Sequence, residues 1–346
     1  MLGKFSGKKI LFISARFFNY EKEIQKKLES FGAIVDFFDE RPGNDFITKS
    51  LIRVNRKLLF KKNNDYYNEI INSTKHRNYD IVFIIRGEVI SINNMKKLKE
   101  HHPKAKFILY MWDALSYSPN SKKVKNLFDH VYTFDKNDSL KYSDMKFRPL
   151  FFIDDYKNVA NSKTDIDVLF IGTVHTDRYH ILKKIEKQLE GSGLSFYFYK
   201  YYPSKFLFYL KKIFNSNFRK VKKDEFYFKG LPKKEVLENF TRAKVIVDIE
   251  RPKQNGLTIR TIEVFGAKKK LLTTNQSINE YDLYNSSNIQ VINRDNPVVD
   301  INFINQGFKE PTNEIYNKYS IDYWLCEIIG KNVQMEKMQE RISNMK

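Results

Sequence analysis

Cysteine is nearly absent from this sequence. Cys326 is the only one in 346 residues, which excludes an intramolecular disulfide and a zinc site built on cysteines. The six histidines show no close metal-ligand spacing except His101-His102, whose adjacent side chains diverge on a helix. We therefore expect no metal site made by protein ligands, no metal cofactor, and a reducing, cytoplasmic environment.

Long apolar segments are lacking as well. The first nine residues are basic, but the apolar run Ile10–Ile13 that follows is far too short for a signal peptide or a membrane span. We expect a cytoplasmic protein that is soluble or peripheral on the inner face of the cell membrane.

Three common motifs are missing. The first expected strand is followed by Ala15-Arg16-Phe17-Phe18 and not by G-x-G-x-x-G, which argues against a dinucleotide held in the usual way. The sequence also contains no G-x-x-x-x-G-K-[ST] and no nucleophile-elbow spacing, so P-loop and hydrolase functions are disfavoured.

The charge of the chain is strongly positive. Lys+Arg number 61 and Asp+Glu 41, a formal charge of +20, so the partner is expected to be anionic: nucleic acid, a nucleotide or an acidic membrane surface. An excess of Lys, Asn, Ile, Phe and Tyr is also typical of an AT-rich genome, which explains part of the basicity without any function.

Short apolar strands alternate with helices along the chain, and the pattern restarts after Pro149. This alternation is typical of parallel, doubly wound α/β sheets. We predict two Rossmann-like domains facing across a cleft, at 1–150 and 151–311, with helices in 312–346 packing back across the junction. The expected strands are 9–14, 34–38, 80–85, 106–111, 130–133, 167–171, 195–199, 244–249, 270–273 and 289–292, and the expected helices are 20–31, 65–75, 91–101, 177–189 and 233–242.

The most informative segment is 254–275. Gly256 and Thr258 precede a short helix that carries Arg260 and Glu263 and runs through Gly266 into an apolar strand. The free N–H groups and dipole of such a helix start favour a phosphate, Arg260 can fork onto it, and Glu263 can accept from sugar hydroxyls. An ordinary i, i+3 ion pair between Arg260 and Glu263 explains the same spacing equally well.

A second glycine-containing segment follows the strand at 167–171. Gly172, His175 and Arg178 lie between this strand and a helix, an arrangement that resembles half of a pyrophosphate clamp. A loop histidine bonded to the backbone is an equally good interpretation of His175.

Two carboxylates follow strands in the first half of the chain. Asp113 comes just after the strand at 106–111, and Glu88 follows the strand at 80–85. Either can act as general base toward an acceptor hydroxyl, with Asp113 the first choice and Glu88 the second. A carboxylate that caps the following turn is an alternative for both.

The segment 201–223 interrupts the alternation with aromatic residues interleaved with Lys and Arg. Rings that enter a headgroup boundary and basic groups that meet anionic lipids describe an interfacial helix. A core-facing helix with a solvated basic end is the alternative.

Several runs together resemble bacterial glycosyltransferases of the GT-B fold, and more narrowly the spore-maturation (CgeB-like) and the capsule or lipopolysaccharide biosynthesis enzymes. The resemblance covers roughly 80–293 and rests on Tyr110–Asp113, Phe128–Asp135, Phe147–Leu150, Asp167–Gly172 and Gly256–Glu263. It implies an N-terminal acceptor domain, a C-terminal nucleotide-sugar domain and metal-independent transfer. It also implies that Arg260 is the phosphate-binding arginine and Glu263 the ribose-facing acid.

One departure from the family concerns stereochemistry. Many retaining GT-B enzymes have two glutamates seven residues apart near this helix, whereas Glu250 and Glu263 are too far apart to match. Retention or inversion of the anomeric centre is therefore left open.

The leading hypothesis is a transferase that moves a sugar from a nucleotide-diphosphate sugar to a surface glycan or lipid-linked acceptor. A nucleic-acid-binding protein would use the charge and the 21 Tyr and 29 Phe for phosphate contacts and stacking, but the basic residues are mostly dispersed. A catalytically silent glycan-binding scaffold is the third possibility.

Overall fold

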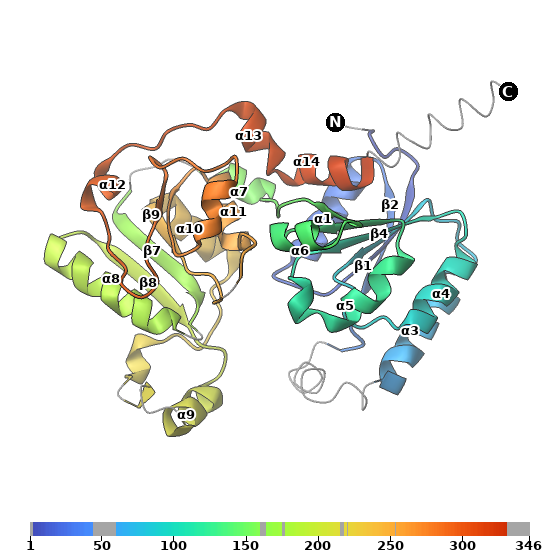
Figure 1. Ribbon diagram of the computed structural model, residues 1–346, viewed down its shortest axis with the longest axis horizontal. Coiled ribbons are helices and arrows are strands. Elements are labelled where there is room, and N and C mark those ends of the chain that lie inside the picture. Colours follow the sequence, from blue (N-terminus) through green and yellow to red (C-terminus); the bar gives the residue numbers. More distant parts are fainter. Residues whose placement is uncertain are drawn as a thin grey trace. The chain divides into compact units, whose positions relative to one another are not determined.

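The computed structural model describes residues 3–43, 60–159, 164–174, 177–214, 218–219, 221–252 and 254–330 (Figure 1). The chain divides into two compact units: unit 1 comprises 1–150 and 321–346, and unit 2 comprises 151–320. Each unit is built on a parallel sheet with helices between successive strands. This confirms the prediction of two Rossmann-like α/β domains.

Unit 1 contains, within the described ranges, a six-stranded parallel sheet in the order β2-β1-β3-β4-β5-β6. Its elements are β1 (Lys9–Ser14), α1 (Tyr20–Ser30), β2 (Ile34–Asp39), α3 (Phe60–Thr74), β3 (Ile81–Ile85), α4 (Ile92–His101), β4 (Lys106–Met111), η1 (Leu115–Tyr117), α5 (Pro119–Val124), η2 (Lys125–Leu127), β5 (His130–Thr133), α6 (Lys136–Lys141), β6 (Met145–Phe147), α14 (Ile321–Leu325) and the π-helix η6 (Cys326–Gly330). The predicted strands all form, and β6 was not predicted.

The core of unit 1 follows from the two-residue period of its strands. Leu11 and Ile13 of β1 belong to the cluster formed with α3, α4 and α5, whereas Phe12 stacks on Phe83 with ring centroids 5.4 Å apart on the other face. Trp324 of α14 contacts Phe83 on that second face, with ring centroids 6.0 Å apart. Strands buried on both faces explain why the sequence shows continuous apolar runs here.

Unit 2 contains, within its described residues, a five-stranded parallel sheet in the order β11-β10-β9-β7-β8. Its elements are α7 (Asp154–Lys157), β7 (Ile166–Thr173), α8 (Arg178–Ser192), β8 (Phe196–Tyr201), α9 (Lys205–Phe214), η4 (Lys223–Glu225), α10 (Lys233–Arg242), β9 (Ala243–Asp248), α11 (Ile259–Gly266), β10 (Lys270–Thr273), η5 (Gln276–Glu280), β11 (Ile289–Val291), α12 (Ile301–Asn305) and α13 (Asn313–Lys318). Strand β7 ends two residues later than predicted, because its pairing with β8 continues to Thr173 and Tyr201.

One close contact fixes α11 in unit 2. Gly266 lies against the ring of Phe152, where any Cβ atom at position 266 would clash with the ring. Its carbonyl accepts a hydrogen bond of 2.6 Å from Tyr316 of α13. The glycine that the sequence places at the end of this helix therefore allows close packing.

The predicted C-terminal helices divide between the units. Helix α13 belongs to unit 2, and α14 belongs to unit 1, where Lys27 of α1 forms a 3.0 Å ion pair with Asp322. The chain thus returns to unit 1 after Ser320. Among the helices of the described ranges, none has the length and apolar character needed to cross a membrane.

Candidate functional sites at the carboxyl ends of two sheets

The strand order of each sheet indicates where a ligand binds. Numbered within its own unit, each sheet begins 2-1-3-4-5, so the connections leave in opposite directions from the first and third strands. Ligands of open α/β sheets bind beyond the carboxyl ends at this switch point. The relevant strand ends are those of β1 and β3 in unit 1 and those of β7 and β9 in unit 2.

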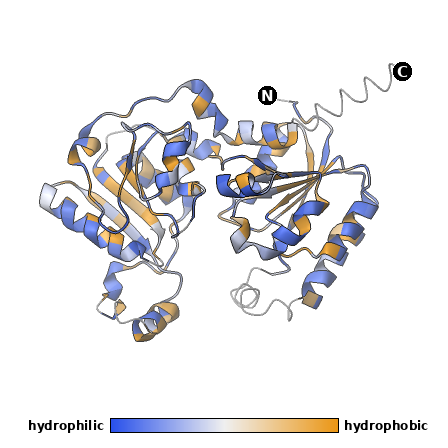
Figure 2. Ribbon diagram, in the orientation of Figure 1, coloured by the Kyte–Doolittle hydropathy of each residue, from blue (hydrophilic) through white to orange (hydrophobic). Residues whose placement is uncertain are grey.

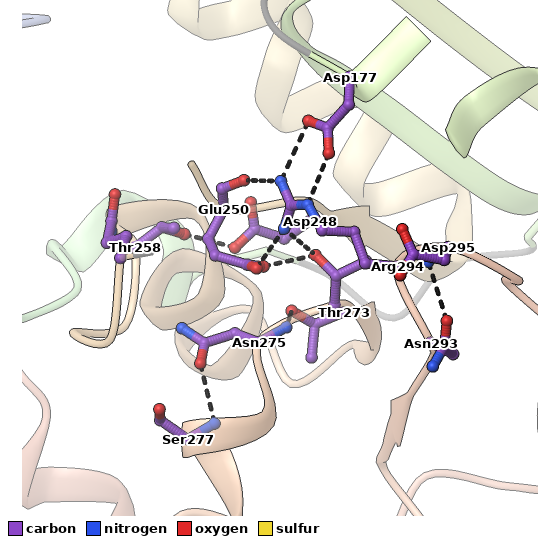
Figure 3. A network of polar contacts seen from close by, with 12 residues as sticks. Asp177, Asp248, Glu250, Thr258, Thr273, Asn275, Ser277, Asn293, Arg294 and Asp295 are labelled. Carbon is purple, nitrogen blue, oxygen red and sulfur yellow. Dashed lines mark hydrogen bonds and ion pairs between the residues drawn. The ribbon is translucent and has the colours of Figure 1, made fainter. Parts of the chain in front are cut away.

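In unit 2, Arg294 connects three loops at the carboxyl edge of the sheet (Figure 3). It donates to Asp177 through Nε at 2.7 Å and Nη2 at 3.2 Å, and to Glu250 through Nη1. Nη2 also donates to the Glu250 carbonyl at 2.7 Å, and Nη1 to Thr274 at 3.3 Å. These five contacts match the five donors of a guanidinium, so Arg294 braces the site and has no donor to spare for a ligand.

The opposing charges in this network perturb one another. Burial raises the pKa of Glu250, partly offset by hydrogen bonds from Thr274 and the charge of Arg294. Burial also opposes the charge of Arg294, but its bond with Asp177 and the proximity of Glu250 raise its pKa overall. The network is thus an interdependent set of charges within one domain.

The start of α11 is also organised by polar side chains. Thr258 is the N-cap and accepts from the Thr261 amide at 3.1 Å, as expected for a threonine at this position. Both threonine hydroxyls donate to Asp248 at the end of β9, that of Thr261 at 2.7 Å. The carbonyl of Gly256 accepts from Gln254 at 3.1 Å. The glycine-containing loop and the short helix predicted from the sequence are therefore present, and the structure adds the cap at Thr258.

Arg178 differs from Arg294 in having donors to spare. It is the first residue of α8, and its Nη1 donates to the Thr173 carbonyl at 2.9 Å. Its Nε is buried and has no hydrogen-bond partner among the described residues. The pKa of Arg178 lies below its usual value, because burial disfavours the charged guanidinium; the nearby charge of Asp248 opposes this shift. An anion bound at this position would offset that desolvation.

The other predicted residues of this loop have different outcomes. Gly172 lies inside β7 and not in a turn, because it pairs with Lys200 of β8. A side chain at position 172 would lie 3.0 Å from the Phe170 ring. His175 lies outside the described residues.

Arg260 and Glu263 form the i, i+3 ion pair that the sequence left as an alternative, with Nη1 and Oε2 2.8 Å apart. The guanidinium also lies over the Phe240 ring, 5.1 Å from its centre. Burial and the nearby charge of Glu263 raise the pKa of Tyr156 in α7. Glu263 and Phe240 thus both contact the Arg260 guanidinium, and Tyr156 senses the charge of Glu263.

In unit 1, both candidate bases contact one arginine. Arg86 follows β3, with Nη2 3.3 Å from Glu88 Oε1 and Nε 3.3 Å from Asp113 Oδ2. Arg41, after β2, donates to Glu88 at 2.9 Å. Arg86 adopts a left-handed backbone conformation with φ of 78°, which is uncommon outside glycine and often occurs at functional sites. Tertiary structure thus brings Asp113 and Glu88 into one cluster.

A fully buried carboxylate supports this cluster. Glu40 accepts from the Val89 amide at 3.0 Å, and its Oε2 has no partner among the residues that the structure describes. Burial raises the pKa of Glu40 to about 7, with the charge of Arg86 opposing the shift and that of Glu88 adding to it.

Exposed aromatic rings accompany the cluster at the switch point. Phe17 and Phe18 follow β1 and are 42% and 76% exposed, and Phe17 lies 5.6 Å from Trp112, which follows β4. Phe18 and Asn19 both have positive φ values of 50° and 63°. An apolar surface beside charged groups suits a ligand with both apolar and hydroxyl-bearing faces.

Sequence reasoning missed Arg294, Asp248 and Asp177 in unit 2 and Arg86, Arg41 and Glu40 in unit 1. A usable signal was available, since each lies within three residues of a strand end or at a helix N-cap. Within the described ranges, no group of three or more His, Cys, Asp or Glu is placed to hold a metal ion.

No protein-family model matches this chain, and a comparison with curated proteins gives no match. Solved structures do resemble it. A glycosyltransferase from Rickettsia africae aligns with a TM-score of 0.56 and 13% identity over 96% of this chain and 98% of that one. The UDP-forming α,α-trehalose-phosphate synthase of Burkholderia vietnamiensis gives 0.57 and 10%, over 96% and 100%.

The same fold also occurs outside transferases. The UDP-GlcNAc 2-epimerase of Neisseria meningitidis, bound to UDP-GlcNAc, aligns with a TM-score of 0.51 and 10% identity over 96% of this chain and 100% of that one. Similarity at this level establishes fold only. The chain has the two-domain, glycosyltransferase-like fold of the GT-B type. Of these neighbours, the trehalose-phosphate synthase is UDP-forming and the epimerase is bound to UDP-GlcNAc.

Proposed function

We propose that this protein is a glycosyltransferase that moves a sugar from a nucleotide-diphosphate sugar to a surface-glycan or lipid-linked acceptor. The observation that carries the proposal is Arg178, whose buried Nε lies near the switch point of unit 2 without a partner among the described residues. A diphosphate supplies the acceptor oxygens that this donor lacks.

The start of α11 provides the second half of the proposed donor site. Thr258 uses only one of the N–H groups at this helix start, and the others can face a phosphate. In this proposal Arg260 exchanges Glu263 for a phosphate oxygen, and Glu263 then accepts from the ribose. Arg178, Arg260 and the helix start neutralise the leaving diphosphate, so transfer needs no metal ion.

The acceptor site that we propose is the carboxyl edge of unit 1. Asp113 acts as the general base toward the acceptor hydroxyl, or Glu88 if Asp113 does not. Phe17 and Trp112 provide an apolar surface against which the C–H face of a sugar ring can pack. The narrower assignment, a CgeB-like or capsule or lipopolysaccharide enzyme, rests on the sequence motifs.

We further propose that the protein acts in the cytoplasm at the inner face of the cell membrane, where lipid-linked acceptors reside. The basic, aromatic segment 201–223 supports this location.

Nucleotide binding tests the proposal. A thermal-shift panel of UDP, GDP, CMP and dTDP should identify one ligand that, at 100 times its dissociation constant, stabilises the fold by about 2.7 kcal/mol. Titration calorimetry should then show binding weakened by about 1.5 to 3 kcal/mol in Arg178→Ala and in Arg260→Ala.

The matched control is Arg242→Ala, which removes an exposed arginine of the same unit from its pair with Asp165 and should leave affinity unchanged. Wild-type affinity in Arg178→Ala would contradict the proposed donor site. Tight binding of a single-stranded oligonucleotide without any nucleoside diphosphate binding would instead favour the nucleic-acid-binding class.

A further inference from the structure

Helix α9 is attached to unit 2 through a single buried residue. Phe208 is completely buried, whereas no other residue of α9 is. Its ring contacts those of Phe218 and Phe226 at 5.3 and 5.2 Å, and that of Tyr202 at 5.6 Å. An aromatic cluster therefore holds one side of the helix against the domain.

The opposite side of α9 exposes large apolar side chains. Phe206, Tyr209, Ile213 and Phe214 are 70%, 49%, 61% and 83% exposed. Their spacing of i, i+3, i+7 and i+8 places them on one helical face, away from Phe208. Figure 2 shows hydrophobic colouring along this helix. Scattered exposed apolar residues are ordinary, but such a group on one helix indicates an interaction surface.

Helix α9 lies in a basic segment of the chain. Lys211 lies over the Phe218 ring at 4.4 Å, and Lys212 donates to the Val221 carbonyl at 2.9 Å, so both extend along the side that meets the domain. The sequence from 201 to 223 contains seven Lys or Arg and no Asp or Glu. The apolar face thus belongs to a segment whose ionic side chains all carry positive charge.

We propose that the exposed face of α9 inserts into the headgroup boundary of an anionic lipid bilayer. Phe206, Tyr209, Ile213 and Phe214 enter the acyl boundary, and the basic groups of the segment meet lipid phosphates. A second copy of the same face is a poor occupant, because seven positive charges would meet seven more. The inference rests on the membrane location proposed above and is independent of the transfer chemistry.

Flotation of the full-length protein with vesicles tests this inference. The wild type should bind vesicles of phosphatidylcholine with about a quarter phosphatidylglycerol at low salt, and phosphatidylcholine alone much more weakly. The double variant Phe206→Ser, Ile213→Ser should lower partitioning at least about tenfold, because it removes two inserted side chains.

A matched control carries Phe60→Ser and Leu140→Ser, which change two residues of unit 1 that are 58% and 76% exposed. It should bind vesicles as the wild type does. Glutamine at Lys205, Lys222 and Lys223 should lower binding to anionic vesicles by about fivefold for each lysine. These three lysines are exposed, so their loss leaves the aromatic cluster intact.

Equal partitioning of the wild type and the Phe206, Ile213 variant would overturn the inference. A different pair of results would assign the face to a second copy of the chain. In that case the wild type would bind no lipid, and sedimentation velocity without vesicles would show self-association that this variant abolishes. Circular dichroism of the same preparations shows that each variant is folded. Nucleoside diphosphate titration, measured separately, distinguishes failure of this inference from failure of the proposed transferase function.

Discussion

The two sheets share a strand order and a switch point, yet the groups at their carboxyl ends differ. In unit 2, Arg294 uses all its donors to join loops that follow β7, β9 and β10, and hydroxyls of α11 engage Asp248. In unit 1, Arg86 joins carboxylates after β3 and β4, above a buried Glu40 and beside exposed aromatic rings. One topology therefore supports a polar, helix-lined edge and an aromatic, carboxylate-rich edge.

Topology thus selects the place of a site, and side chains select its chemistry. A capped helix start with a spare arginine donor suits a phosphate, whereas carboxylates beside rings suit a hydroxyl-bearing acceptor. If this comparison is right, each edge depends on its own network of charges, and substitutions in one network should affect that unit alone.

Arg294→Ala should have the largest effect. It leaves Asp177 and buried Glu250 without their counter-charge, which should lower the free energy of unfolding of unit 2 by about 3 to 5 kcal/mol. Hydrogen exchange in β9, β10 and β11 should accelerate, with β1 and β3 as the internal reference.

The comparison for this variant is Arg242→Ala, whose ion pair with Asp165 is exposed. Exposed pairs contribute little, so exchange should stay at the wild-type rate. Equal protection in both variants would mean that the Arg294 network does not stabilise unit 2.

Glu40→Gln should alter the pH dependence of unit 1. The unfolded carboxyl loses its proton near pH 4.5 and the folded one near 7, so between these values the folded state holds more protons and stability falls as pH rises. The loss reaches about 3 kcal/mol by pH 7, taking about 1.4 kcal/mol per unit of pKa. The variant should lack this decline.

Both tryptophans, Trp112 and Trp324, lie in unit 1, so tryptophan fluorescence during urea unfolding reports on this unit alone. Measurements from pH 5 to 8 should show the two curves diverging. Glu69→Gln, at an exposed position of α3, should follow the wild type. A Glu40→Gln curve parallel to the wild type would place the titration elsewhere.

Asp113→Asn should preserve nucleotide binding and lower turnover about 100-fold, as for loss of a general base. The measurement is release of nucleoside diphosphate from the nucleotide sugar that the binding panel selects. Asp65→Asn, at an exposed position of α3, is the control. Near-normal turnover in Asp113→Asn with a large loss in Glu88→Gln would transfer the role to Glu88, and normal turnover in both would remove this edge from the chemistry.

Thr258→Ala should have the smallest effect, about 1 kcal/mol in the stability of unit 2, because α11 loses its N-cap. Thr258→Ser keeps the hydroxyl and should retain most of that stability, as measured by hydrogen exchange at the start of α11. A serine variant as unstable as the alanine variant would show that the methyl group, and not the cap, matters.

Local patterns were enough to predict some features. The short helix Ile259–Gly266 and the strand Lys270–Thr273 are set by neighbouring residues, namely the glycine-containing loop before the helix and a short apolar run after it. By contrast, the end of β7 was misjudged at Gly172, because pairing with β8 prolongs the strand through a residue that locally favours a turn. The spacing of Arg260 and Glu263 is equally compatible with phosphate binding and with an ion pair, so the contact in the structure could not be predicted from spacing alone.

The α/β class, the two repeated halves and most of the strands can be predicted from local sequence, since buried parallel strands require continuous apolar runs. Which strand ends become neighbours depends on the pairing of the strands in the folded sheet. Arg294 and Asp177 are far apart in the chain and show no common period, yet the order β11-β10-β9-β7-β8 brings their loops to one edge. Glu40, Arg86 and Asp113 meet for the same reason, because sheet pairing, not sequence distance, sets which charges interact.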